Sequence, residues 1–278
     1  PLLLAMPVLA VAFVPLALNA RAASRAGQTF TADFARDLLD SVAPSAILIT
    51  NGDNDTFPLW YAQEVEGYRR DVVVVVASYL RTDWLPWQLM RRGVALAGDQ
   101  READSVPQLV QLATPQQFEA GAIHVTIPAG YLTRDQLFVL RMVRDVLLRR
   151  PIYFTNSSYP HALGLEPYLV TEGLAVHLMP AAVTESRYIA ATGAGMVDVP
   201  RSIALWRGTF RGPAAFERQD DWIDPASLNM PAQYVFAGSL LAEALGKEGM
   251  NAERAAVEAD VQRLLSVANL GSLFERRD

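Results

Sequence analysis

Apolar and polar positions along this chain follow two different periods, and each period predicts a kind of element. In residues 29–42, apolar side chains recur every three or four positions with charged side chains between them, which predicts an amphipathic helix. Residues 46–50 are a short apolar run, and residues 72–76 are five consecutive valines. Because a continuous β-branched run has no polar face, it predicts a strand that is buried on both sides, as in a parallel sheet.

Strand-like and helix-like segments keep alternating further along the chain. The predicted strands lie at 123–127, 152–155 and 175–178, and the predicted helices lie at 57–67, 82–92 and 133–150. This order predicts an α/β fold with a mainly parallel sheet and flanking helices. Two Ala- and Leu-rich segments, 229–246 and 252–267, then predict a helical hairpin.

The first eighteen residues carry no charged and no strongly polar side chain. A helix needs about 20 apolar residues to cross the bilayer core, so this segment predicts the end of a membrane span. A signal peptide and a buried soluble helix are the alternatives. Arg21 and Arg25 follow the segment and weakly indicate a cytoplasmic exit. The expected parts are the end of a transmembrane helix at 1–20, an α/β soluble domain at 25–225 and a C-terminal helical hairpin at 226–278.

Composition narrows the classes of function. The net charge is −6, with 24 Lys and Arg against 30 Asp and Glu, so the chain has no basic excess for binding nucleic acid. Cysteine is absent, which excludes thiol nucleophiles and Cys–zinc sites. The three histidines lie far apart in the sequence, and no cofactor-binding motif is present. We therefore expect no metal and no cofactor.

Polar side chains are concentrated just after the first predicted strand. Asn51, Asp53, Asn54 and Asp55 lie between that strand and the next predicted helix. Ligands of open α/β sheets bind at the carboxyl ends of strands, where this loop should lie. The loop could contact a ligand, hold a cation through its oxygens, or only make a turn and cap the helix. It does not match the calcium-loop pattern, because its glycine precedes the acids.

Two further loops should open on the same edge of a parallel sheet. Asp83 and Trp84 follow the valine run, and Asn156 follows the strand at 152–155. Together with Trp60, these loops would offer carboxylates, amides and aromatic rings. Amides and carboxylates bind sugar hydroxyls, and flat rings stack on sugar rings, so the set favours a carbohydrate ligand. The alternative is that the aromatic side chains belong to the core.

Residues 46–67, followed by Thr82, Asp83 and Trp84, resemble a family of bacterial membrane proteins called domain of unknown function 2723. Tyr153-Phe154 and residues 172–180 also resemble that family, and the resemblance covers about residues 25–180. Members of the family resemble multispanning protein O-mannosyltransferases. The resemblance implies a bacterial inner-membrane protein whose soluble domain lies outside the cytoplasm, in conflict with the weak signal from the two arginines.

The same resemblance implies that the catalytic acids lie in a membrane region before this segment, so no catalytic residue can be assigned here. Three hypotheses follow. In the first, the chain is a soluble accessory domain of a membrane glycosyltransferase-like protein that binds an acceptor, a glycan or a lipid-linked sugar. In the second, it is a protein–protein interaction module of a membrane protein. In the third, it is a hydrolase that uses Asp53 and Asp55 as a carboxylate pair.

Overall fold

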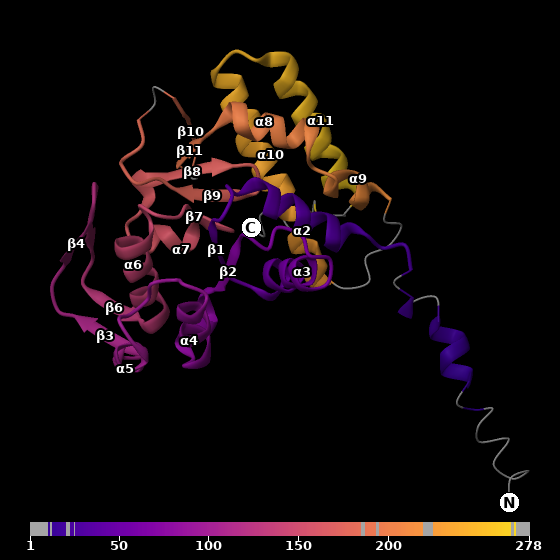
Figure 1. Ribbon diagram of the computed structural model, residues 1–278. Helices are drawn as coiled ribbons and strands as arrows, with labels where there is room; N and C mark the ends of the chain where they lie inside the picture. The colour runs from indigo at the N-terminus through magenta and orange to yellow at the C-terminus, as the bar shows by residue number, and fades with distance from the viewer. Residues whose placement is uncertain are drawn as a thin grey trace, which may run out of the picture.

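The computed structural model describes residues 11, 13–20, 23–24, 26–184, 187–192, 195–218, 225–267 and 270. Within these residues, seven strands form one central sheet with helices on both faces (Figure 1). In spatial order the strands are β10 (Ile189–Ala191), β11 (Gly195–Val197), β8 (Leu169–Glu172), β9 (Ala175–Leu178), β7 (Ile152–Phe154), β1 (Ile47–Thr50) and β2 (Val73–Val76).

The sheet is mixed rather than mainly parallel. The three runs expected to form its centre do lie side by side in parallel, as β7, β1 and β2. However, β9 is antiparallel to both β7 and β8, and β10 is antiparallel to β11. The reason is local: β8 and β9 are joined by only Gly173 and Leu174, and a two-residue connection forces a hairpin. Gly173 has a φ of +61°, which a residue without a Cβ adopts easily.

The strands have apolar residues on both faces, as the valine run predicts. Leu48, Val74 and Tyr153 belong to the core on one face, and Ile49, Val75 and Phe154 belong to the core on the other. Burial of alternate residues on opposite faces therefore explains why these strands have no polar side.

Helices from two parts of the chain cover the first face. These are α2 (Phe30–Ser41), α3 (Asp53–Glu64), α8 (Val199–Gly208), α9 (Gly212–Glu217), α10 (Asn229–Lys247) and α11 (Asn251–Val267). The hairpin of α10 and α11 shares its core with the sheet, because Tyr234 and Leu240 lie in the same apolar cluster as Leu48. Figure 1 shows α8, α10 and α11 grouped beside the β8–β11 end of the sheet.

The second face is covered by shorter helices and two small ribbons. The helices are α4 (Trp84–Arg91), α5 (Gln100–Ser105), α6 (Arg134–Val146) and α7 (Ser158–His161). One ribbon pairs β3 (Leu109–Leu112) with β6 (Gly130–Thr133), and the other pairs β4 (Gln116–Ala120) with β5 (Ile123–Ile127). The segment at 123–127 is thus a strand, but it lies outside the central sheet. Short 3₁₀ helices occur at Ala77–Arg81, Glu166–Tyr168 and Pro225–Leu228.

The N-terminal apolar segment is described only in part. Residues 1–10 and 12, which belong to the expected span, lie outside the described residues. Residues 13–20 are helical and extend away from the sheet (Figure 1), with their side chains exposed. None of the helices in the described part of the chain is long and apolar enough to cross a bilayer.

Candidate functional site

A cavity of about 510 Å³ opens at the carboxyl edge of the central sheet. The ends of β1, β7 and β8 point the same way, so the residues that follow them meet at this edge. Five of the eight residues predicted from the sequence line the cavity, namely Asn51, Asp53, Asn54, Asp55 and Asn156. The loop after β1 and the loop after β7 are therefore brought together, as the parallel pairing of those strands requires.

Asp55 is the buried hydrogen-bond acceptor that holds the cavity wall together. Its carboxylate accepts hydrogen bonds from the backbone N–H groups of Gly52, at 2.9 Å, and Asn51, at 3.1 Å. It also accepts one from the hydroxyl of Thr155, at 2.5 Å. The side chain is only 4% exposed. Asp55 thus caps α3 and joins the loop after β1 to the loop after β7, which gives it a structural role and weakens the carboxylate-pair hypothesis.

Asp53 differs from Asp55 although it is only two residues away. It is the first residue of α3, its side chain is exposed, and it makes no hydrogen bond or ion pair with the residues that the structure describes. Asn156 has an intermediate position: its side-chain oxygen accepts a hydrogen bond from the N–H of Ser158 at 3.1 Å, which fixes the start of α7. Asp53 is therefore the charged group of this wall that is available to a ligand.

A second wall of the cavity comes from α10, and the sequence patterns do not predict it. Asn229, Gln233 and Phe236 line the cavity from that helix. The side-chain oxygen of Gln233 is buried and has no hydrogen-bond partner within the described residues. The ring of Phe236 is 52% exposed. The signal in the sequence is the spacing of four and three residues, which places all three side chains on one face of a helix.

The remaining predicted residues lie elsewhere. Asp83 pairs with the buried guanidinium of Arg134 at 2.6 Å, and neither residue lines the cavity. Trp60 is half-buried and packs against both cores. Trp84 contacts Tyr79, with ring centroids 5.8 Å apart. A 3₁₀ helix follows β2 directly, and neither this helix nor the loop after it lines the cavity.

The cavity has an acidic lining without a compensating base. Two carboxylates, those of Asp53 and Asp55, line it, and none of its lining residues is Lys, Arg or His. The other lining groups are amides, hydroxyls, apolar side chains and the exposed ring of Phe236. Among the described residues, no three His, Asp or Glu side chains are placed to hold a metal ion. This arrangement suits an uncharged ligand with several hydroxyl groups.

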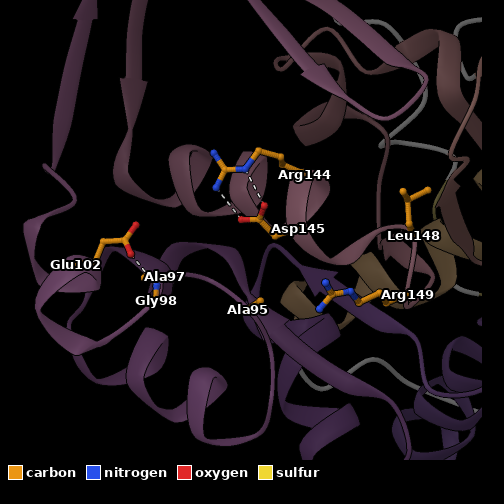
Figure 2. Close-up of a pocket in the computed structure, with 8 residues that line it drawn as sticks. All are labelled: Ala95, Ala97, Gly98, Glu102, Arg144, Asp145, Leu148 and Arg149. Atoms are coloured by element: carbon orange, nitrogen blue, oxygen red, sulfur yellow. Dashed lines mark hydrogen bonds and ion pairs between the residues drawn. The ribbon is translucent and has the colours of Figure 1, made fainter.

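A second pocket, of about 500 Å³, lies at the opposite edge of the sheet, because it is formed by the end of α6 just before β7 (Figure 2). Most of its charged groups are already engaged in ion pairs or hydrogen bonds. Figure 2 shows Arg144 paired with Asp145, at 2.7 Å, and Glu102 bonded to the backbone N–H of Gly98, also at 2.7 Å. The carboxyl-edge cavity is therefore the better candidate for a ligand site.

Comparison with known proteins identifies a family. The family model TMEM260-associated domain 2 matches residues 31–111 and 102–200, which together span more than half of the chain. No curated protein and no solved structure matches the sequence. The match does not show membership of domain of unknown function 2723, the family that the sequence resembles, but it does associate the chain with a membrane protein. The chain belongs to the family called TMEM260-associated domain 2.

Proposed function

We propose that the chain is an accessory domain of a membrane glycosyltransferase-like protein and that its carboxyl-edge cavity binds an uncharged sugar of the acceptor or product. The family name associates the domain with TMEM260, a membrane protein of glycosyltransferase-like type. The observation that carries the proposal is the cavity itself, whose polar lining includes the free carboxylate of Asp53 and the residue Gln233, whose buried side-chain oxygen has no partner among the described residues.

The lining of the cavity fits the chemistry of a sugar. A sugar presents hydroxyl groups that donate and accept hydrogen bonds, and a flatter, apolar ring face. The buried oxygen of Gln233 has no donor among the described residues, and because an unpaired buried acceptor costs about 1–3 kcal/mol, a sugar hydroxyl that donates to it would be favourable. Asp53 and Asn156 add an acceptor and an amide, and Phe236 provides a ring on which a sugar can stack.

The charge of the cavity distinguishes an uncharged sugar acceptor from a phosphorylated sugar donor as its ligand. Lipid-linked and nucleotide-linked sugar donors carry phosphate groups, which Lys, Arg or helix N-termini bind in proteins. Here the N-terminus of α3 is already occupied by Asp55, and the lining adds the negative charge of Asp53. A phosphorylated donor would be repelled, so the cavity favours the uncharged sugar.

The exposed apolar helix at 13–20 supports a link to a membrane. Val14, Leu16 and Leu18 are 53%, 60% and 77% exposed, so these large apolar side chains are not covered by the described part of the chain. We propose that the segment lies in a bilayer and that the sheet domain lies on the side outside the cytoplasm.

Replacing Asp53 by asparagine should weaken binding of methyl α-mannoside by about tenfold, which corresponds to about 1.4 kcal/mol, because a charged acceptor is replaced by a neutral one. Folding should not change, since Asp53 is exposed and its side chain makes no hydrogen bond or ion pair with the described residues. Calorimetric titration of the 278-residue chain checks the affinity, and thermal unfolding checks the fold.

A matched control is available in the second pocket. Asp145→Asn removes an exposed ion pair with Arg144 and should leave the affinity for the mannoside unchanged. Equal affinities for the unmodified chain and Asp53→Asn, or no binding of any neutral glycoside, would contradict the proposed function.

A further inference from the structure

The outer face of α3 carries an exposed apolar stripe. Phe57, Tyr61 and Val65 follow one another at intervals of four residues and are 49%, 51% and 68% exposed. We call these three residues the α3 stripe. Large apolar side chains grouped on a surface mark a contact with a partner or a membrane.

Aromatic rings extend the stripe across the surface. Phe57 contacts Trp60 with ring centroids 5.8 Å apart, and Trp60 contacts Tyr79 at 6.3 Å. Tyr79 in turn contacts Trp84, which is 47% exposed. The aromatic residues that do not reach the sugar cavity thus form a continuous row beside the α3 stripe. Tryptophan and tyrosine are enriched at the level of lipid headgroups.

Next to the stripe lies a basic pocket of about 670 Å³, lined by Tyr61 and by residues of α2, α9 and the segment before α2. Arg36 lines it but is paired with Asp33 and Glu66. Arg211 and Arg218 line it as well, and their guanidinium groups make no ion pair or hydrogen bond with the described residues. The two carboxylates that line the pocket, Asp33 and Glu66, are the ones paired with Arg36, so Arg211 and Arg218 leave the lining with an excess of positive charge that can bind phosphate.

The short connection between the apolar helix at 13–20 and the basic pocket limits the distance between them. Gln28 and Thr29 line the basic pocket. The seven residues between that helix and Gln28 can span at most about 25–30 Å. The α3 stripe and the basic pocket therefore lie close to any bilayer that holds the apolar helix.

We propose that the α3 stripe and the basic pocket form one membrane-contact surface, which lies on a bilayer of anionic phospholipid. The stripe enters the headgroup region, and Arg211 and Arg218 bind headgroup phosphates. This surface is separate from the sugar cavity: Tyr61, Arg211 and Arg218 do not line that cavity. The proposal therefore does not depend on the sugar-binding function.

The absence of cysteine makes a direct test possible, because a single introduced cysteine can be labelled without background. Val65→Cys carries an environment-sensitive nitrobenzoxadiazole dye in the 278-residue chain, mixed with vesicles of phosphatidylcholine alone or with 30% phosphatidylglycerol. We expect a blue shift of emission and quenching by lipids with a quencher in the acyl chain. The control is Leu109→Cys on β3, in one of the small ribbons on the second face of the sheet. Leu109 is 53% exposed, and its label should emit as in water.

The arginines are tested in the labelled Val65→Cys chain. Each neutralised arginine should weaken binding to anionic vesicles about fivefold, so Arg211→Gln with Arg218→Gln should weaken it about 25-fold. Thermal unfolding confirms that this double variant folds. A Val65 label that emits as in water while the chain is bound to vesicles would overturn the proposal. So would a blue shift that needs no lipid and grows with protein concentration, since this would indicate a second copy of the chain.

Discussion

Replacing Asp37 by alanine is expected to lower the free energy of unfolding by about 3 kcal/mol at pH 7. Asp37 lies on α2, is fully buried, and accepts hydrogen bonds from the N–H groups of Arg211 and Gly212 and from the hydroxyl of Tyr234 at 2.6 Å. The variant leaves three donors without an acceptor and separates α2 from α9 and α10. Urea denaturation measures the change.

A matched control for this prediction is Glu258→Ala on α11. It removes an exposed ion pair with Arg254 and should cost less than about 1 kcal/mol. If Asp37→Ala were as stable as this control, the buried carboxylate would not hold the C-terminal helices on the sheet.

The same residue should make stability depend on pH. Burial raises the pKa of Asp37 to about 6 from an ordinary 3.8, although three donors oppose the rise. The folded state therefore binds the proton more tightly than the unfolded state. The resulting stabilisation is complete below pH 3.8 and is lost as the pH rises through about 6, with a total of about 3 kcal/mol. Comparing the free energy of unfolding of the unmodified chain and of Asp37→Asn at pH 4.5 and 7.5 isolates the contribution of Asp37. An equal pH dependence of the two free energies would contradict this prediction.

The second large effect is expected at Asp55. Asp55→Ala should lower the free energy of unfolding by about 3 kcal/mol, because the buried hydroxyl of Thr155 and the part-buried N–H groups of Asn51 and Gly52 all lose their acceptor. Asp55→Asn should still cost about 1–2 kcal/mol. Asparagine and aspartate cap helices about equally in general, but here both carboxylate oxygens accept backbone N–H groups, and an amide offers only one oxygen.

Its control is the neighbouring Asp53→Asn, which should change stability by less than about 0.5 kcal/mol, the usual limit for surface substitutions. Urea denaturation of the two asparagine variants compares them directly. Equal free energies of unfolding for the two variants would contradict the assignment of Asp55 as a structural carboxylate and of Asp53 as a free one.

The central strands are predictable because local sequence alone decides them. Five consecutive valines leave no polar face, and the structure buries four of them as β2 between two apolar cores. The mixed direction of the sheet is not predictable in this way. It depends on the short connection at Gly173, which the sequence shows as one glycine among 17.

The site likewise has residues that the sequence predicts and residues that it does not. The loops at Asn51 and Asn156 follow parallel strands, so topology alone places them together. Gln233 and Phe236 lie about 180 residues further along the chain than the first loop, and only tertiary packing brings α10 to that edge. Asp83 follows the 3₁₀ helix after β2 and does not line the cavity. No pattern in the five residues of that helix, Ala77–Arg81, predicts it.

Binding of an uncharged sugar in the carboxyl-edge cavity is the central function that we propose for this domain. Nuclear magnetic resonance of the side-chain amides, with methyl α-mannoside and mannose 1-phosphate added in turn to the 278-residue chain, tests this claim directly. The neutral glycoside should shift the amide signals of Gln233 and Asn156 and leave that of Gln117, on β4, unchanged. The phosphate ester should shift none of them. Shifts confined to Gln117 and its surroundings, or equal shifts with both compounds, would contradict the account.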